Sequence, residues 1–149
     1  MHQLRIFLAD DDADDRMLFQ EALLSAGIAA ELTTAEDGYQ LMDSLAQIAE
    51  PPPPDLIFLD INMPGKDGKA CLREIRNNNK FDKTPVVMFT TSTYLKDIED
   101  TYREGANMYV SKTDFFMNDV QWMKAVLASD WQSQTSRPPR EKFMFSVKK

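Results

Sequence analysis

Histidine and cysteine are almost absent from this 149-residue chain, which contains one of each, His2 and Cys71. A single cysteine excludes an internal disulfide and argues against a cysteine-rich zinc site. A single histidine beside the amino terminus argues against a histidine-based catalytic triad or a histidine-rich metal centre. Any metal site must then rely on oxygen ligands, which favour hard cations.

Long apolar runs are missing as well. None approaches the roughly 20 residues of a membrane span. The amino terminus, MHQLRIFLADDD, has too short an apolar segment for a signal peptide. We therefore expect a cytoplasmic protein without membrane contact, of a length that suits one domain.

The net charge of −7 is unevenly distributed. Residues 132–149 contain five basic and one acidic side chain, so they carry +4, whereas the body through Trp131 carries −11. Such a body repels nucleic acid phosphates, so we expect no nucleic acid partner. The composition predicts one domain over residues 1–131 and an extension over residues 132–149 that is either flexible or docked.

Short apolar runs alternate with amphipathic segments along the chain. Strand-like runs lie at 4–9, 29–34, 56–59, 86–89 and 108–111, and helical spacing follows at 13–26, after Gly38, and at 67–76, 95–104 and 115–129. Five strand–helix units predict an α/β fold with a parallel sheet and helices on both faces. In the first helix, the expected apolar stripe comprises Met17, Leu18, Ala22, Leu23 and Ala26.

Polar residues stand where the apolar runs end. Asp10 and Asp11 follow the first run, Asp60 the third, Thr90 ends the fourth and Lys112 follows the fifth. Each alone is an ordinary residue for a strand end. Because right-handed crossovers bring the carboxyl ends of all strands to one edge, we expect these side chains to meet where α/β sheets bind ligands.

Three carboxylates at one edge predict a cation. Pairs within about 5 Å repel by roughly 3 kcal/mol at an effective dielectric constant near 20. Magnesium accepts one or two carboxylates together with a phosphoryl oxygen, whereas zinc lacks its usual ligands here. With the metal bound, Asp60 can attack a phosphoryl group, while Lys112 and the Thr90 hydroxyl contact its oxygens.

The pattern DD…D-x-N-M-P-x-x-D-G…T-T-S…Y-x-x-K resembles the receiver domain of two-component response regulators over roughly residues 4–130. The resemblance implies a doubly wound, flavodoxin-like sheet of five parallel strands in the order 2-1-3-4-5. It also implies that Asp60 accepts phosphate from a histidine kinase or phosphotransfer protein. The TTS run and the polar loop before Pro85 are similar to a stand-alone subgroup that includes partners of bacterial phytochromes.

The resemblance implies a role for each matching residue. Asp11 would contact magnesium directly and Asp10 through water, with Asp60 and the backbone carbonyl of Asn62 as further ligands. Thr90 and Lys112 would match the family's conserved hydroxyl and lysine. Tyr109 would match its aromatic switch, although it could simply pack as a strand residue.

One position departs from the family pattern. A proline usually follows the lysine, often after a cis peptide bond, but here Thr113 follows Lys112. A cis bond before threonine would cost about 2.5–4 kcal/mol. We therefore expect either a trans bond with a reshaped loop or a strained cis bond.

These features predict a single-domain response regulator that is not an enzyme. Phosphorylation would alter the face formed by the fourth helix, fifth strand and last helix, which, like the tail, could also form a homodimer. Two alternatives are a phosphorylation-independent adaptor and an aspartyl-phosphate phosphohydrolase, although Asn62 stands where such hydrolases usually have a second Asp. In the tail, Phe143, Phe145 and Val147 have a strand-like period, so the tail is either disordered or adds a strand to the body.

Overall fold

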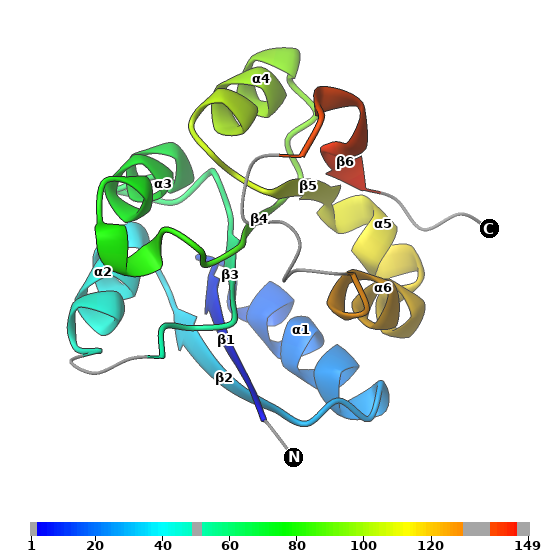
Figure 1. Ribbon diagram of the computed structural model, residues 1–149. Helices are drawn as coiled ribbons and strands as arrows, with labels where there is room; N and C mark the ends of the chain where they lie inside the picture. Colours follow the sequence, from blue (N-terminus) through cyan, green and yellow to red (C-terminus); the bar gives the residue numbers. More distant parts are fainter. Residues whose placement is uncertain (1–2, 49–51, 130–137, 146–149) are drawn as a thin grey trace.

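The computed structural model describes residues 3–48, 52–129 and 138–145. Five strand–helix units follow one another, and a short strand from the tail completes the described chain (Figure 1). In chain order the elements are β1 (Leu4–Ala9), α1 (Ala13–Ser25), β2 (Ala30–Ala35), α2 (Gly38–Ala46), β3 (Leu56–Leu59), α3 (Gly68–Arg76), the 3-10 turn η1 (Asn79–Phe81), β4 (Val86–Thr90), α4 (Leu95–Arg103), β5 (Met108–Ser111), α5 (Lys112–Met117), α6 (Asp119–Leu127), the 3-10 turn η2 (Arg140–Lys142) and β6 (Met144–Phe145).

All described strands form one parallel sheet in the order β2-β1-β3-β4-β5-β6. The predicted order 2-1-3-4-5 is confirmed for the core. The sheet has one strand more than expected, because β6 from the carboxyl-terminal segment pairs with β5 (Figure 1). The central strand β3 is buried along its whole length, as its apolar sequence predicts.

Helices cover both faces of the sheet (Figure 1). One core lies under α2, α3 and α4, and the other lies under α1, α5 and α6. Cys71 is buried in the first core, and burial raises the pKa of its thiol to about 11, so it packs as a small apolar group. The doubly wound arrangement leaves the two ends of the sheet free for loops.

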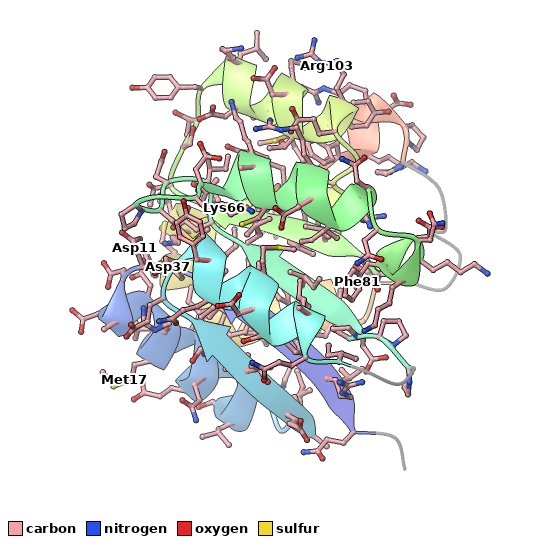
Figure 2. All side chains as sticks on the ribbon, turned by 90° about the vertical axis from the view of Figure 1, so that its left-hand side faces the viewer. Asp11, Met17, Asp37, Lys66, Phe81 and Arg103 are labelled. Atoms are coloured by element: carbon pink, nitrogen blue, oxygen red, sulfur yellow. The ribbon has the colours of Figure 1, made fainter. Side chains whose placement is uncertain are left out.

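The buried stripe of α1 differs from the prediction. Phe19, Ala22 and Leu23 are buried, whereas Met17 is 53% exposed and lies on the outer surface (Figure 2). The Phe19 ring instead meets the Phe58 ring of β3, edge to face, with 4.9 Å between centroids. Met17 and Leu18 are as apolar as the buried Ala22 and Leu23. The apolar pattern therefore does not determine which side of α1 faces the sheet.

The last predicted helix is two helices. Asn118, with φ −148° and ψ 54°, leaves the helical region and separates α5 from α6. Helix α5 also begins three residues before the predicted start, directly after β5. Ser111 caps α5, because its side chain accepts a hydrogen bond from the Thr113 N–H at 3.1 Å. Proline has no N–H for this bond, so Thr113 supports the early start of the helix.

The described part of the tail packs on the body. Its Phe143 is fully buried, and β6 lies along β5 beside α4 (Figure 1). Residues 130–137 and 146–149, among them Val147, lie outside the described residues, so the division at residue 131 stays a prediction. None of the helices in the described ranges is long and apolar enough to cross a membrane. The expected cellular location also stays a prediction.

Candidate functional site

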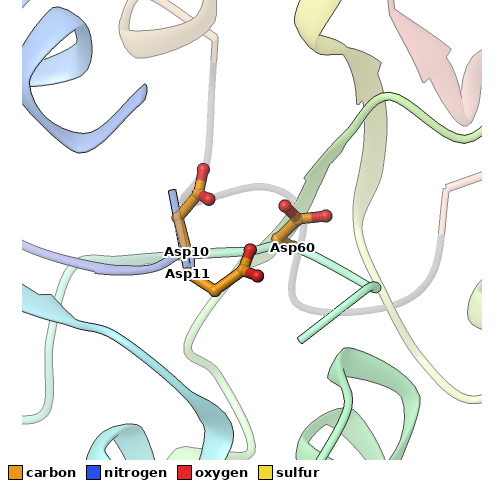
Figure 3. Close-up of side chains that lie close together, drawn as sticks. All are labelled: Asp10, Asp11 and Asp60. Carbon is orange, nitrogen blue, oxygen red and sulfur yellow. The ribbon is translucent and has the colours of Figure 1, made fainter. Parts of the chain in front are cut away.

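Three carboxylates converge at the carboxyl edge of the sheet. Asp10 and Asp11 follow β1, and Asp60 follows β3, which pairs directly with β1. Figure 3 shows these side chains close together, and one oxygen from each lies within 4.8 Å of the others. Asp10 and Asp60 are buried, whereas Asp11 is exposed at the end of the molecule away from Phe81 (Figure 2). The predicted acidic cluster therefore exists, with one side open to solvent.

The ammonium of Lys112 lies inside this cluster. Its Nζ is 2.8 Å from Oδ2 of Asp10, of Asp60 and of Asp15. Burial alone would lower the pKa of Lys112, but the contacts with these three carboxylates outweigh burial and raise the pKa above its ordinary value. The lysine is therefore charged at neutral pH and can stabilise a further anionic group.

Asp15 was not expected in the site. Asp12 is the N-cap of α1, and Asp14 and Asp15 occupy the first turn. An acidic residue there is favoured by the helix dipole wherever its side chain points. No signal in the sequence therefore separates Asp15, which reaches Lys112, from its exposed neighbour Asp14.

Asp10 is a strongly perturbed carboxyl group. Burial raises the pKa of Asp10 to about 6, against the lowering effect of Lys112 and of the Asp12 N–H. Its Oδ1 accepts the Asp12 N–H at 3.0 Å. Its buried Oδ2 faces Lys112 without the alignment of a hydrogen bond. This oxygen is thus available to a cation or to a water molecule bound to one.

The charges in the pocket do not balance. Asp10, Asp15 and Asp60 share the ammonium of Lys112, and Asp11 adds a further carboxylate beside Asp10 and Asp60. The excess negative charge, the all-oxygen donor set and the Asp10 oxygen that accepts no hydrogen bond fit a hard divalent cation. The residues present therefore match the metal type that the sequence predicts.

The loop after β3 is folded tightly under Asp60. Asn62 lies two positions beyond Asp60 in this loop, with an exposed side chain. At the loop's end, the Gly68 N–H donates to the Ile61 carbonyl at 2.8 Å. A Cβ added to Gly68 would lie 2.1 Å from the Asp60 carbonyl oxygen. Only glycine fits at this position. Because Gly68 has no side chain, the start of α3 can pack directly against the backbone of Asp60.

Thr90 and Tyr109 are both connected to Ser92. The buried Thr90 hydroxyl accepts the Ser92 N–H at 3.3 Å, and the Tyr109 hydroxyl donates to the Ser92 carbonyl at 2.9 Å. Burial raises the pKa of Tyr109, so its hydroxyl remains a donor. The Ser92 hydroxyl donates to Asp97, which also binds Lys69 of α3 at 2.7 Å. Ser92, which the sequence analysis included in the TTS run without a role of its own, therefore joins Thr90 to the predicted switch residue Tyr109.

Comparison with known proteins agrees with this geometry. The family model of the response regulator receiver domain matches residues 6–120. The chain belongs to this family. The predicted family and the predicted class of function, a response regulator of a two-component system, are thereby confirmed.

Individual relatives cover nearly the whole chain. The response regulator Rcp1 of Synechocystis sp. is 35% identical over 136 residues, which span 89% of this chain and 92% of Rcp1. The crystal structure of the phosphorylated cyanobacterial phytochrome response regulator RcpA is similar with a TM-score of 0.78 at 33% identity, covering 93% of this chain and 100% of RcpA. The structure of the Mn²⁺-bound form of Rcp1 has a TM-score of 0.71 at 33% identity, and the match covers 91% of this chain and 99% of Rcp1. RcpA is thus one similar protein from the phytochrome-associated subgroup that the sequence resembles.

Proposed function

We propose that Asp60 accepts a phosphoryl group from a histidine kinase or phosphotransfer protein in a magnesium-dependent reaction. The observation that carries this proposal is the 2.8 Å contact between Lys112 Nζ and Asp60 Oδ2 beside two further carboxylates. A carboxylate nucleophile next to a fixed cation and a metal-type donor set is what phosphoryl transfer requires. The Mn²⁺-bound form of the similar protein Rcp1 supports a divalent cation here.

The residues of the pocket divide the chemistry among them. A carboxylate oxygen of Asp60 attacks phosphorus, the bond between phosphorus and the donor imidazole nitrogen breaks, and an acyl phosphate forms. Lys112 can redirect one N–H to a phosphoryl oxygen, and Thr90 can donate its hydroxyl proton to another. Magnesium would be held by Asp10, Asp11, Asp60 and the Asn62 carbonyl, and when bound it supplies charge neutralisation.

Phosphorylation would then act on the surface beyond Thr90. The modification adds about −1.5 to −2 charge at Asp60. Movement of Thr90 toward the phosphoryl group would release its bond to Ser92 and leave space that favours an inward Tyr109. A partner, including a second copy of the chain, that binds the face of α4, β5, α5 and α6 more tightly in one state would shift the equilibrium between states.

Acetyl phosphate and beryllofluoride, each with magnesium, test the assignment. Intact-mass measurement should show one added phosphoryl group on the wild type after acetyl phosphate, and beryllofluoride should bind the wild type. Asp60→Asn should show neither effect. Asp43→Asn, an exposed change on α2, is the matched control and should behave as the wild type. Equal modification of Asp60→Asn would show that the acceptor lies elsewhere.

We further propose that the chain is a phosphoacceptor rather than a phosphohydrolase. Asn62 cannot serve as the acid or base that turnover of small phosphate esters requires. We expect each chain to hydrolyse less than one molecule of a small phosphate ester. Sustained hydrolysis by the wild type that disappears in Asp60→Asn would contradict this proposal. The other alternative, a phosphorylation-independent adaptor, predicts that a partner binds wild type and Asp60→Asn equally with and without beryllofluoride.

A further inference from the structure

The described tail segment, residues 138–145, covers the outer edge of β5 (Figure 1). Phe143 is fully buried, with its ring centroid 5.1 Å from that of Tyr102 and 6.0 Å from that of Tyr109. The Tyr109 N–H donates to the Phe143 carbonyl at 2.9 Å. The tail therefore touches both the ring and the backbone of the predicted switch residue.

Two further contacts fasten the segment to α4. The Tyr102 hydroxyl donates to the Pro138 carbonyl at 2.8 Å, and Arg140 Nε donates to Glu99 Oε1 at 2.7 Å. The basic arginine meets an acidic helix residue, as the opposite charges of tail and body favour. Met144, the residue after Phe143, is 45% exposed. The segment is thus held by one buried aromatic ring and by polar contacts around it.

A continuous line of contacts joins this segment to the phosphorylation site. Tyr109 binds the tail with its backbone and ring, and binds the Ser92 carbonyl with its hydroxyl. Ser92 in turn donates its N–H to Thr90, which ends the strand next to β3 and Asp60. Both ends of Tyr109 are therefore engaged, one by the tail and one by the loop that carries Thr90.

We infer that docking of residues 138–145 holds Tyr109 inward and thereby favours phosphorylation of Asp60. Outward rotation of Tyr109 would separate its ring from Phe143 and uncover both. The docked tail and the phosphoryl group thus favour the same inward position of one side chain. This inference rests on the proposed function, and adds to it an effector site that belongs to the chain itself. Since coupling between two sites is reciprocal, phosphorylation must strengthen docking by the same factor.

The affinity for beryllofluoride tests the coupling. We would titrate the full chain in magnesium by fluorine NMR, comparing wild type with Phe143→Ala, Arg140→Gln and the control Met144→Ala. Phe143→Ala should weaken binding about fivefold, the lower end of usual coupling factors. Arg140→Gln, which leaves the buried ring in place, should weaken binding less. Met144→Ala should match the wild type.

Amide hydrogen exchange of Tyr109 provides the reciprocal measurement, because this N–H is bonded to the tail. Beryllofluoride should slow its exchange in the wild type by about the same fivefold factor. Equal affinities in Phe143→Ala and Met144→Ala, with Tyr109 exchange insensitive to beryllofluoride, would overturn the inference. The inference would also be overturned if tenfold dilution of the protein changed the effect of the tail on beryllofluoride affinity. Such a change would mean that the tail docks on a different chain.

Two controls separate this inference from the proposed function. Failure of beryllofluoride to bind wild type would reject the proposed function itself. A different result would reject only the role of the tail. In that case the wild type binds beryllofluoride, Asp60→Asn does not, and the tail variants all bind with equal affinity. The far-ultraviolet circular dichroism of each variant shows whether it is folded, and Arg140→Gln tests the tail without opening the core.

Discussion

Asp15 and Lys112 form an ion pair between the first turn of α1 and the start of α5, with Nζ 2.8 Å from Oδ2. An ammonium group has three N–H donors. In Lys112 one is donated to Asp15 and one to Asp60, and Asp10 lies at the same distance. A phosphoryl group on Asp60 would therefore compete with these carboxylates for the ammonium of Lys112.

Asp15→Asn should consequently tighten beryllofluoride binding while it destabilises the fold. Removal of one carboxylate frees an N–H of Lys112 for the new anion, and we expect about a threefold gain in affinity, which corresponds to roughly 0.7 kcal/mol. The free energy of unfolding should fall by about 1–2 kcal/mol, because a charged hydrogen bond is lost. Fluorine NMR and urea denaturation measure the two effects.

Asp14→Asn is the matched control, since Asp14 occupies the same first turn and has an exposed side chain. Both changes remove one negative charge near the helix amino terminus, so helix-dipole effects cancel in the comparison. Equal behaviour of the two variants would mean that Asp15 does not compete for Lys112.

Asp11 is the exposed member of the acidic cluster, and Asp11→Asn should weaken magnesium binding. Loss of one of three carboxylates lowers the attraction for the cation, and we expect at least about a tenfold weaker affinity by isothermal titration calorimetry. Magnesium at ten times the wild-type Kd should stabilise wild type by about 1.4 kcal/mol and the variant by about 0.4 kcal/mol. Asp14→Asn should retain the wild-type affinity, and an unchanged Kd in Asp11→Asn would remove Asp11 from the ligand set.

The sequence predicts the core of this fold because local and global signals agree there. All core strands except β2 are short apolar runs, and a side chain caps the amino terminus of α1, α2, α3 and α5. Asp12 and Asp67 cap α1 and α3 as their positions before the helices predict. Parallel topology then brings Asp10, Asp11, Asp60 and Lys112 to one edge without any knowledge of side-chain packing.

The remaining features depend on contacts between distant segments. Asp15 meets a lysine 97 positions away, and nothing in its neighbourhood indicates the contact. Strand β6 is only two residues long. The alternation of apolar and polar residues over so short a stretch cannot distinguish a docked tail from a disordered one. Ser92 contacts Thr90 and Tyr109 through its backbone N–H and carbonyl. The identity of a residue does not predict such backbone contacts. Asn118 looks compatible with a helix, and its break becomes visible only in the dihedral angles.

Gly68→Ala should disrupt the site through the backbone. The added Cβ would lie 2.1 Å from the Asp60 carbonyl oxygen and 2.8 Å from Ile61 Cα, so the loop after β3 must move. Overpacking of this kind costs about 1–3 kcal/mol, measured as a fall in the free energy of unfolding. Beryllofluoride binding should fall in the same variant, because the backbone of Asp60 is displaced.

Gly27→Asn is the control for a glycine substitution away from the site. Gly27 has φ +69°, and an added Cβ would meet no atom within 4 Å. Asparagine tolerates this conformation, so the change should cost little and leave beryllofluoride binding intact. If Gly68→Ala bound beryllofluoride as tightly as Gly27→Asn, close packing under Asp60 would not matter for the chemistry.

An ion-pair network between α3 and α4 should contribute to stability in a defined pH range. Asp100 is held by Lys69 and Lys96, each at 3.0 Å, and by Arg103, and the hydrogen bonds from the two lysines lower the pKa of Asp100 to about 2. The unfolded carboxyl group has a pKa of about 3.9, so the unfolded chain binds the proton more tightly. The stabilisation is therefore complete above about pH 4 and is lost as the pH falls toward 2.

Asp100→Asn should remove this pH-dependent part of the stability. Urea denaturation of wild type and variant should show a difference in the free energy of unfolding at pH 6 that shrinks steadily between about pH 4 and 2. Asp43→Asn, the exposed change on α2, controls for the loss of one negative charge. A constant difference across this range would show that Lys69 and Lys96 do not hold the charged form of Asp100. Asp97, which binds Lys69 at 2.7 Å and also accepts the Ser92 hydroxyl, and the pair of Arg73 with Glu104 at 2.9 Å would still join α3 to α4.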